Sequence, residues 1–147
     1  MEIIRGNRSF DLDEFLKKPL FAHLSTLSAD GPRESPVWFH WENECIWIIG
    51  TPSSDSFPGR VEANPKCAIG IVELEHTTGK VLHAGFRGCA TVESFDKGIT
   101  NRLLTRYLGS NHEKWDPMFR ELDDNNILIR FVPETVVVRD QSFNPSI

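Results

Sequence analysis

The sequence has little positive charge, and no part of the chain concentrates it. Its 147 residues include 16 Lys and Arg against 21 Asp and Glu, which gives a formal net charge of −5. No block of Lys or Arg occurs along the chain. Nucleic acids and anionic membrane surfaces are bound through clustered basic residues that neutralise phosphate charge. We therefore expect the protein to bind neither nucleic acid nor membrane.

Cysteine is also scarce, because the chain has only Cys45, Cys67 and Cys89. None of the three is close to another in sequence, and no CxxC motif occurs. Closely spaced cysteines are the usual signature of disulfide frameworks and zinc sites. The sequence therefore predicts no disulfide and no metal site, and it favours reduced thiols in a cytoplasmic protein.

Long apolar segments and catalytic sequence motifs are missing too. No run approaches the roughly 20 apolar residues of a membrane-spanning helix, and residues 1–15 lack the apolar core of a signal peptide. The glycine patterns of nucleotide-binding loops, the serine elbow of hydrolases and the HExxH motif of zinc enzymes do not occur. If the chain is an enzyme, we expect a bound cofactor to carry the chemistry.

What the chain does contain is a series of short apolar segments separated by strong turn signals. We expect strands over residues 20–27, 35–41, 45–50, 66–73, 81–93, 127–132 and 135–139. We expect helices over residues 11–17, 58–63 and 96–108, with a further helical turn or two within 112–122. Because the strands do not alternate regularly with helices, this order predicts an antiparallel barrel with peripheral helices in a single domain, residues 1–147.

The segment from Thr51 to Arg60 follows an apolar strand and has the composition of an anion-binding loop. Phosphate groups bind to hydroxyls, backbone N–H groups and helix N-termini, usually together with a cation. A helix is predicted to begin at Pro58, whereas the carboxylate of Asp55 would repel a phosphate. The hydroxyl groups belong to Thr51, Ser53, Ser54 and Ser56. The residues alone leave two interpretations open, a phosphate site and an ordinary surface loop.

Three aromatic residues, Trp38, Phe39 and Trp41, lie on alternating faces of the predicted strand 35–41. Aromatic side chains beside a phosphate loop could frame a planar ligand. Core packing is the alternative interpretation, because aromatic residues favour strands in general.

Taken in order, several segments resemble the pyridoxamine 5′-phosphate oxidase-like superfamily of flavin-binding split β-barrels. A short helix precedes AHLSTLSADGPRESPVWFHWENECIWIIGT, and the serine-bearing loop, NPKCAIGIV, VLHAGFRGCATVE and a helix with RYLG follow. The resemblance covers roughly residues 10 to 140. It implies a mainly β (α+β) fold, a six-stranded antiparallel split β-barrel with a few peripheral helices. It also implies a homodimer with two FMN molecules in clefts between the subunits.

The resemblance assigns three groups of residues to the cofactor. The strand whose backbone runs along the isoalloxazine ring corresponds to Ser35, Pro36, Val37 and Trp38. The groups that hold the phosphate correspond to Thr51, Asp55, Ser56 and Phe57. The side chain that reaches the flavin of the partner subunit corresponds to His83, where the family often has glutamine.

Three positions depart from the pattern of the family. The family usually has Lys or Arg at the positions of Ser56 and Phe57, and often a basic residue at that of His40. The phosphate site therefore keeps its hydroxyl groups and loses much of its positive charge, unless Arg33 or Arg60 replaces it. One lost charge-assisted contact costs about 1.5–3 kcal/mol, so we expect weak FMN binding or a different ligand.

These observations favour an FMN-binding flavoprotein that acts as a small oxidoreductase, in which flavin N5 accepts or donates hydride. The final segment VVVRDQSFNPSI does not match the substrate-binding end of pyridoxamine 5′-phosphate oxidase, so we do not expect that activity. A deazaflavin-dependent reductase of the same fold and a flavin-free, non-catalytic binding or stress-related barrel dimer are the alternatives. No catalytic residue is identified, and only His40 and His83 are candidate proton carriers.

Overall fold

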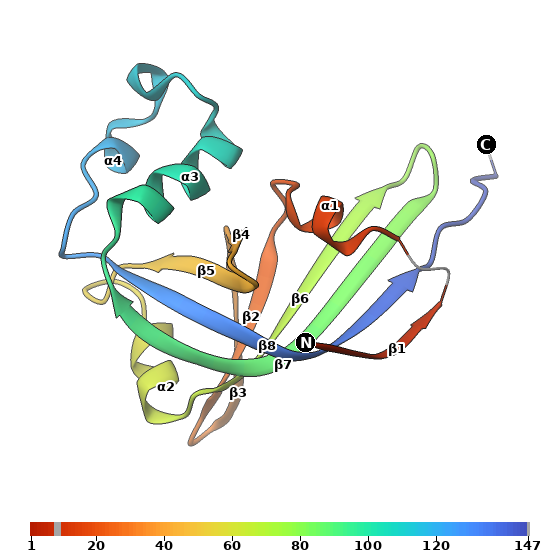
Figure 1. Cartoon of the computed structure of the whole chain (residues 1–147), viewed down its shortest axis with the longest axis horizontal. Helices are drawn as coiled ribbons and strands as arrows, with labels where there is room; N and C mark the ends of the chain where they lie inside the picture. Colours follow the sequence, from red (N-terminus) through yellow and green to blue (C-terminus); the bar gives the residue numbers. More distant parts are fainter. Residues whose placement is uncertain (8–9, 147) are drawn as a thin grey trace.

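The computed structural model describes residues 1–7 and 10–146, which build one strongly curved β-sheet with helices at its margins (Figure 1). The strand order is β3-β2-β6-β7-β8-β5-β4, and β1 pairs with β8 outside this path. Every pairing is antiparallel except that of β1 with β8. The strands are β1 (Glu2–Asn7), β2 (Ala22–Ser28), β3 (Gly31–Val37), β4 (His40–Glu42), β5 (Cys45–Gly50), β6 (Lys66–Glu75), β7 (Lys80–Ser94) and β8 (Ile127–Asp140).

The six longer strands of the antiparallel path form the split barrel that the sequence predicts, and the sheet does not close on itself. The prediction of one strand over residues 35–41 was wrong, because β3 ends at Val37 and the short edge strand β4 begins at His40. The parallel edge strand β1 was not predicted at all. Its six residues, EIIRGN, are stabilised by pairing with β8, which is far away in sequence.

The prediction of two final strands separated by Pro133 was also wrong, because β8 runs without interruption through this residue. Pro133 pairs with Gly88 at a register shift in the β7–β8 ladder. A proline lacks the N–H that a regular ladder needs, so an irregularity is where a strand can accept it. A Cβ atom on Gly88 would lie 2.1 Å from the carbonyl oxygen of Val132, and glycine is therefore required opposite the proline.

The helices begin close to where their capping residues predict. The N–H of Glu14 donates to Asp11 Oδ1 at 3.1 Å, and that of Ile99 donates to Asp96 Oδ1 at 2.9 Å. Side-chain acceptors of this kind satisfy N–H groups that have no partner inside the first helical turn. The helices are α1 (Leu12–Leu16), α2 (Phe57–Ala63), α3 (Lys97–Leu108), the 3-10 helix η1 (His112–Lys114) and α4 (Pro117–Arg120).

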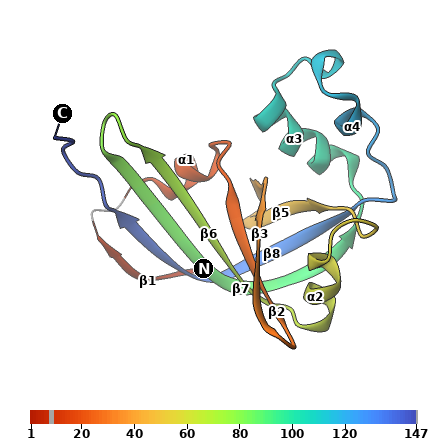
Figure 2. The same ribbon diagram turned by 180° about the vertical axis from the view of Figure 1, so that it is seen from behind.

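Two separate groups of buried side chains hold the molecule together. The larger one fills the inside of the curved sheet and includes Phe39, Phe86 and Phe131, all fully buried. The smaller one contains Leu103, Leu104 and Trp115 and lies under α3, η1 and α4. We call residues 97–122, which form these helices, the cap. Figure 1 and Figure 2 place the cap at the end of the sheet opposite β1 and the C-terminus.

Candidate cofactor cavity

A cavity of about 700 Å³ is lined by the barrel on one side and the cap on the other. This volume lies within the range of roughly 300–1,000 Å³ that is typical of small-molecule sites. The barrel contributes residues 35–38 at the end of β3, Ile49 and the loop 51–57, except for residues 52 and 53. We call this loop, residues 51–57, the loop wall. The cap contributes a second wall, the cap wall, which consists of Leu103, Leu104, Met118, Phe119 and Leu122.

The structure gathers many of the predicted site residues around this cavity. Those that line it are Ser35, Pro36, Val37, Trp38, Thr51, Asp55, Ser56 and Phe57. Those that do not line it are Arg33, His40, Arg60 and His83. The two lining groups come from β3 and from the loop after β5, and β3 and β5 lie in different halves of the sheet order. That these residues contact a flavin stays a prediction.

The loop wall is held in shape by its own hydrogen bonds and by one distant residue. The N–H of Thr51 donates to Asp55 Oδ2 at 2.8 Å, and the carbonyl oxygen of Thr51 accepts from the N–H groups of Ser54 and Asp55. The buried amide of Asn126 donates to Thr51 Oγ1 at 2.8 Å. The Asp55 carboxylate thus occupies a backbone donor that a phosphate would otherwise use. Asn126 lines the cavity but was missed, because no local motif marks it.

The guanidinium of Arg60 contacts the loop wall but does not line the cavity. Its Nε donates to Thr26 Oγ1 at 2.7 Å, and its Nη1 donates to Ser56 Oγ at 2.8 Å. Ser56 lines the cavity, so one hydroxyl separates the guanidinium from the cavity space. Phe57, where the family has a cation, is only 6% exposed and packs in the main core. Arg33 lies on β3 and is exposed.

An aromatic cluster connects the cap to β3 at the edge of the cavity. The rings of Trp38 and Tyr107 are stacked, with centroids 4.5 Å apart and planes within 3° of parallel. Phe119 stacks on Trp38 at 5.4 Å. The hydroxyl of Tyr107 donates to the carbonyl oxygen of Leu20 at 2.7 Å and accepts from the N–H of Phe39 at 3.0 Å. Burial raises the pKa of Tyr107, so it remains a neutral donor near neutral pH.

A half-buried arginine fastens the cap to the barrel. The guanidinium of Arg106 donates to the carbonyl oxygens of Leu16 at 2.9 Å and Lys18 at 2.7 Å, and also to that of Phe39. Burial lowers the pKa of Arg106. Carbonyl oxygens can satisfy a buried guanidinium only where several of them converge on its donors. Sequence reasoning missed this residue, because the carbonyl groups that it binds have no sequence signature.

His40 belongs to a polar chain outside the cavity. Its Nε2 lies 3.1 Å from Glu42 Oε1, and Glu42 is held by Arg102 at 2.6 Å and 2.8 Å. Its Nδ1 is buried and has no hydrogen-bond partner among the residues that the structure describes. Burial lowers the pKa of His40 despite the nearby Glu42 carboxylate. Arg102 holds the pKa of Glu42 below its usual value.

His83 lies in a second hollow, of about 560 Å³, on the outer face of the sheet. Gly70 and Gly85 are paired across β6 and β7 and leave this face flat, while Arg87 and Arg139 give it positive charge. Burial lowers the pKa of His83, and the charge of Arg139 lowers it further. His83 and the larger cavity of one subunit therefore belong to different faces of the molecule.

Residues 1–7 and 10–146 contain neither a metal-binding cluster nor a membrane-spanning helix. No group of three or more His, Cys, Asp or Glu in these ranges could hold a metal ion. No helix there is long and apolar enough to cross a membrane. The cysteines are free, and burial raises the pKa of Cys67 to about 11, so this thiol is unreactive.

The sequence matches no family model and no curated protein, whereas the structure matches solved structures over most of its length. A conserved hypothetical protein from Mycobacterium tuberculosis has a TM-score of 0.71 at 16% identity, and the matched region covers 90% of this chain and 86% of that protein's chain. An F420 reductase has a TM-score of 0.63 at 21% identity, and the matched region covers 87% of this chain and 97% of that protein's chain.

A third solved structure supplies the name of the fold. A candidate pyridoxamine 5′-phosphate oxidase from Listeria innocua has a TM-score of 0.63 at 16% identity, and the matched region covers 86% of this chain and 94% of that protein's chain. At these identities the likeness is one of fold. The chain therefore has the split-barrel fold of the pyridoxamine 5′-phosphate oxidase-like proteins.

Proposed function

We propose that the protein is a flavin-binding oxidoreductase that holds an isoalloxazine ring in the cavity between the barrel and the cap. The observation that carries this proposal is the cavity itself. Its volume of about 700 Å³ is bounded by the strand segment 35–38, the hydroxyl-bearing loop wall and an apolar, partly aromatic cap wall. A planar ring with one polar edge and one polar chain requires these three kinds of surface together. Among proteins of this fold, one is named an F420 reductase.

The strand β3 is suited to bind the polar edge of the ring. Within the described part of the chain it pairs only with β2, so it is an edge strand with unpaired backbone groups. Edge strands readily give such N–H and C=O groups to another binding partner. Ser35 and Val37 line the cavity on this strand, and Pro36 between them has no N–H to donate.

FMN is the first candidate, with its chain directed toward the loop wall. Thr51, Ser54, Ser56 and Asn126 would surround that chain with hydroxyl and amide groups. Bound FMN would supply hydride transfer at N5, while the residues of this chain orient the ring and exclude water from it. Asp55 is the only ionisable residue in the lining, so the phosphate would have no cation of the same subunit beside it. We therefore expect FMN binding to be weak in a single subunit.

The same lack of a cation favours a second candidate, a deazaflavin held as a loosely bound co-substrate. Its ring would occupy the same aromatic and apolar surface, and its charged tail would extend out of the cavity into solvent. The buried Phe57 supports this alternative, because it fills with core packing the position where a phosphate-binding cation is expected.

A homodimer is part of the proposal, because the outer face of the sheet is suited to self-association. Leu27, Val72 and Leu74 on this face are exposed. Exposed apolar groups of this kind mark interaction surfaces when they are contiguous with a flat, small-residue area such as Gly70 and Gly85. The positive hollow at His83, Arg87 and Arg139 would then face the partner and add the charge that the partner's cavity lacks.

Thermal unfolding with added cofactor tests the proposal. A ligand that binds only the folded state stabilises it by about 2.7 kcal/mol at a hundred times its Kd. Stabilisation by FMN supports the first candidate, and stabilisation by a deazaflavin alone supports the second. If neither raises the melting temperature, and the purified protein is colourless, the flavin-free barrel becomes the better account. Light scattering on the same sample measures the mass and contradicts the dimer if it reports a monomer.

A further inference from the structure

The two walls of the cavity differ sharply in chemistry. The loop wall offers hydroxyl groups and the Asp55 carboxylate, and the buried amide of Asn126 adjoins it. The cap wall offers only hydrocarbon, sulfur and aromatic groups. A flavin would direct its polar chain to the loop wall and the polar edge of its ring to the β3 edge, and the ring would cover only the inner part of the cap wall. The part of the cap wall at the mouth of the cavity then remains available to another molecule.

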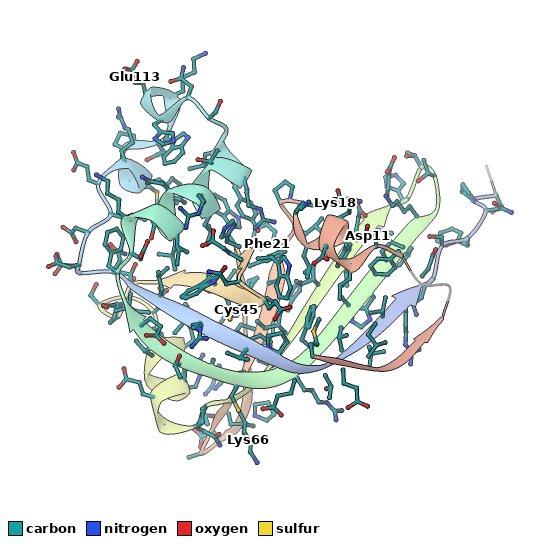
Figure 3. All side chains as sticks on the ribbon, viewed as in Figure 1. Asp11, Lys18, Phe21, Cys45, Lys66 and Glu113 are labelled. Carbon is teal, nitrogen blue, oxygen red and sulfur yellow. The ribbon has the colours of Figure 1, made fainter. Side chains whose placement is uncertain are left out.

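The mouth of the cavity beside the cap wall carries two large apolar side chains that are open to water. Met118 on α4 is 67% exposed, and Phe21, just before β2, is 54% exposed. Figure 3 shows Phe21 near the centre of the molecule, between the cap and α1. Both line the cavity although they come from segments almost a hundred residues apart. Exposed apolar groups that converge on one hollow mark a binding site better than single exposed residues do.

The cap wall is also held in place before any ligand binds. Arg106 ties α3 to the carbonyl groups of Leu16 and Lys18, and Phe119 is stacked on Trp38. A wall fixed in this way loses less conformational entropy when a ligand binds to it than a mobile wall would. Methionine adapts its shape to different apolar ligands, so Met118 suits the flexible rim of a fixed wall.

From these observations we propose that the cap wall, with Met118 and Phe21 at its mouth, binds the second substrate, and that this substrate is an uncharged, planar, apolar molecule. An anionic substrate would have to bury its charge against a wall that offers no cation and no hydrogen-bond donor. The wall therefore selects against phosphorylated and carboxylated substrates, in contrast to a site built for a pyridoxamine phosphate. The binding of an apolar molecule to the cap wall is independent of the proposed function. Only the role of that molecule as a substrate rests on the proposed function.

The test compares naphthol with naphthyl phosphate, two probes with the same ring and different charge. Isothermal titration measures the Kd of each for the purified protein, with and without saturating FMN. We expect naphthol to bind in both conditions and naphthyl phosphate to bind at least about tenfold more weakly, a loss that an unpaired buried charge readily causes. Equal affinities for the two probes would overturn the proposal, as would loss of naphthol binding whenever FMN is present.

Matched variants locate the probe on the cap wall. Met118→Glu places a charge at the mouth, and Ile3→Glu places the same charge on a similarly exposed side chain, 64% exposed, on β1 at the opposite end of the sheet. Phe21→Ser has an equivalent control in Phe143→Ser, since both phenylalanines are 54% exposed. We expect the two mouth variants to weaken naphthol binding by about tenfold and the controls to leave it unchanged. Equal effects in variant and control would place the probe elsewhere.

The outcomes also separate this inference from the proposed function. If naphthol binds at the mouth but neither FMN nor a deazaflavin binds, the flavin proposal fails and the apolar site stands. If a flavin binds and naphthol does not, the substrate inference fails and the flavin proposal stands. The mouth variants lie on exposed side chains, so circular dichroism and thermal unfolding are expected to match the wild-type protein and to exclude misfolding as the cause.

Discussion

The loop wall and the cap wall face the same cavity but are built in opposite ways. The loop wall holds its shape through hydrogen bonds within five residues, from Thr51 to Asp55. The cap wall depends on bonds between groups 88 and 90 residues apart, from Arg106 to Lys18 and Leu16. A wall of the first kind is polar and is held mainly by local hydrogen bonds, with one distant contact from Asn126. A wall of the second kind needs the whole fold, and it leaves its apolar surface facing the cavity.

Because of this difference, the two walls have different roles in ligand binding. Short local bonds leave hydroxyl groups where a polar chain can reach them, although the Asp55 carboxylate already occupies one backbone donor. Other residues of the cap hold α3 and α4 on the barrel. The side chains of Met118 and Phe119 can therefore face a ligand. Changes in the residues that fasten the cap are therefore expected to alter stability and binding together, and changes in the loop wall mainly binding.

The largest effect is expected from removing the fastening of the cap. Arg106→Met deletes charge-assisted hydrogen bonds and leaves buried carbonyl oxygens unsatisfied, so we expect a loss of about 3 kcal/mol in the free energy of unfolding. Urea unfolding measures it. The control is Arg102→Met, which removes an exposed ion pair with Glu42 and is expected to cost less than about 1 kcal/mol. Equal losses in the two variants would show that Arg106 does not fasten the cap.

The next effect concerns the missing cation of the loop wall. Ser54→Lys places a positive charge in the lining of the cavity, and we expect it to tighten FMN binding by about tenfold or more, since a charge-assisted contact is worth about 1.5–3 kcal/mol. Ser53→Lys is the matched control, because Ser53 is also exposed but does not line the cavity. Titration of both variants with FMN measures the change. A tightening of the same size in the Ser53 variant would indicate general electrostatic attraction instead of a phosphate position.

A smaller effect is expected from the hydroxyl that joins the loop wall to Asn126, the residue before β8. Thr51→Ala removes the acceptor of the buried Asn126 amide, so we expect a loss of about 1 kcal/mol in the free energy of unfolding and weaker FMN binding. Thr91→Ala, which removes an exposed hydrogen bond to Glu93, is the control and should change stability by less than about 0.5 kcal/mol. Unchanged FMN affinity in the Thr51 variant would mean that the flavin chain does not reach this hydroxyl.

The smallest effect is a dependence of stability on pH through His40. Burial lowers the pKa of His40 in the folded state, so folding favours the neutral imidazole. The stability that this provides is fully present above the unfolded pKa of about 6.5. It falls as the pH drops through that value toward the lower folded pKa. Urea midpoints measured across this window should decline less in His40→Gln than in the wild-type protein. Parallel declines would assign the dependence to other groups, such as His83.

Much of the barrel could be predicted from the sequence, because its elements are defined locally. Cys45–Gly50 forms β5 with the bounds that its apolar run indicates, and the capping residues Asp11 and Asp96 mark the starts of α1 and α3. The exceptions depend on distant partners. The pairing of β1 and the uninterrupted course of β8 past Pro133 are determined by neighbouring strands and not by their own residues.

The candidate site shows the same distinction between residues defined locally and residues that depend on distant partners. Serine and threonine hydroxyls after an apolar strand can be recognised in a sequence, and Thr51 and Ser56 do line the cavity. Asn126, Tyr107 and Arg106 could not be predicted, because their roles depend on distant hydroxyl and carbonyl groups that only the fold brings to them. The sequence also left open whether Arg60 replaces the missing cation. The structure places it behind Ser56, with its donors directed to Ser56 and Thr26.

The central claim is that a flavin ring binds in the cavity between the loop wall and the cap wall. Flavin fluorescence during titration with the protein tests it most directly, because a ring moved from water to a site beside Trp38 and Phe119, which both line the cavity, loses emission to its aromatic neighbours. We predict saturable quenching of FMN or deazaflavin emission, weaker in Phe119→Ala and stronger for FMN in Ser54→Lys. Emission of both cofactors that stays constant at saturating protein would contradict the account.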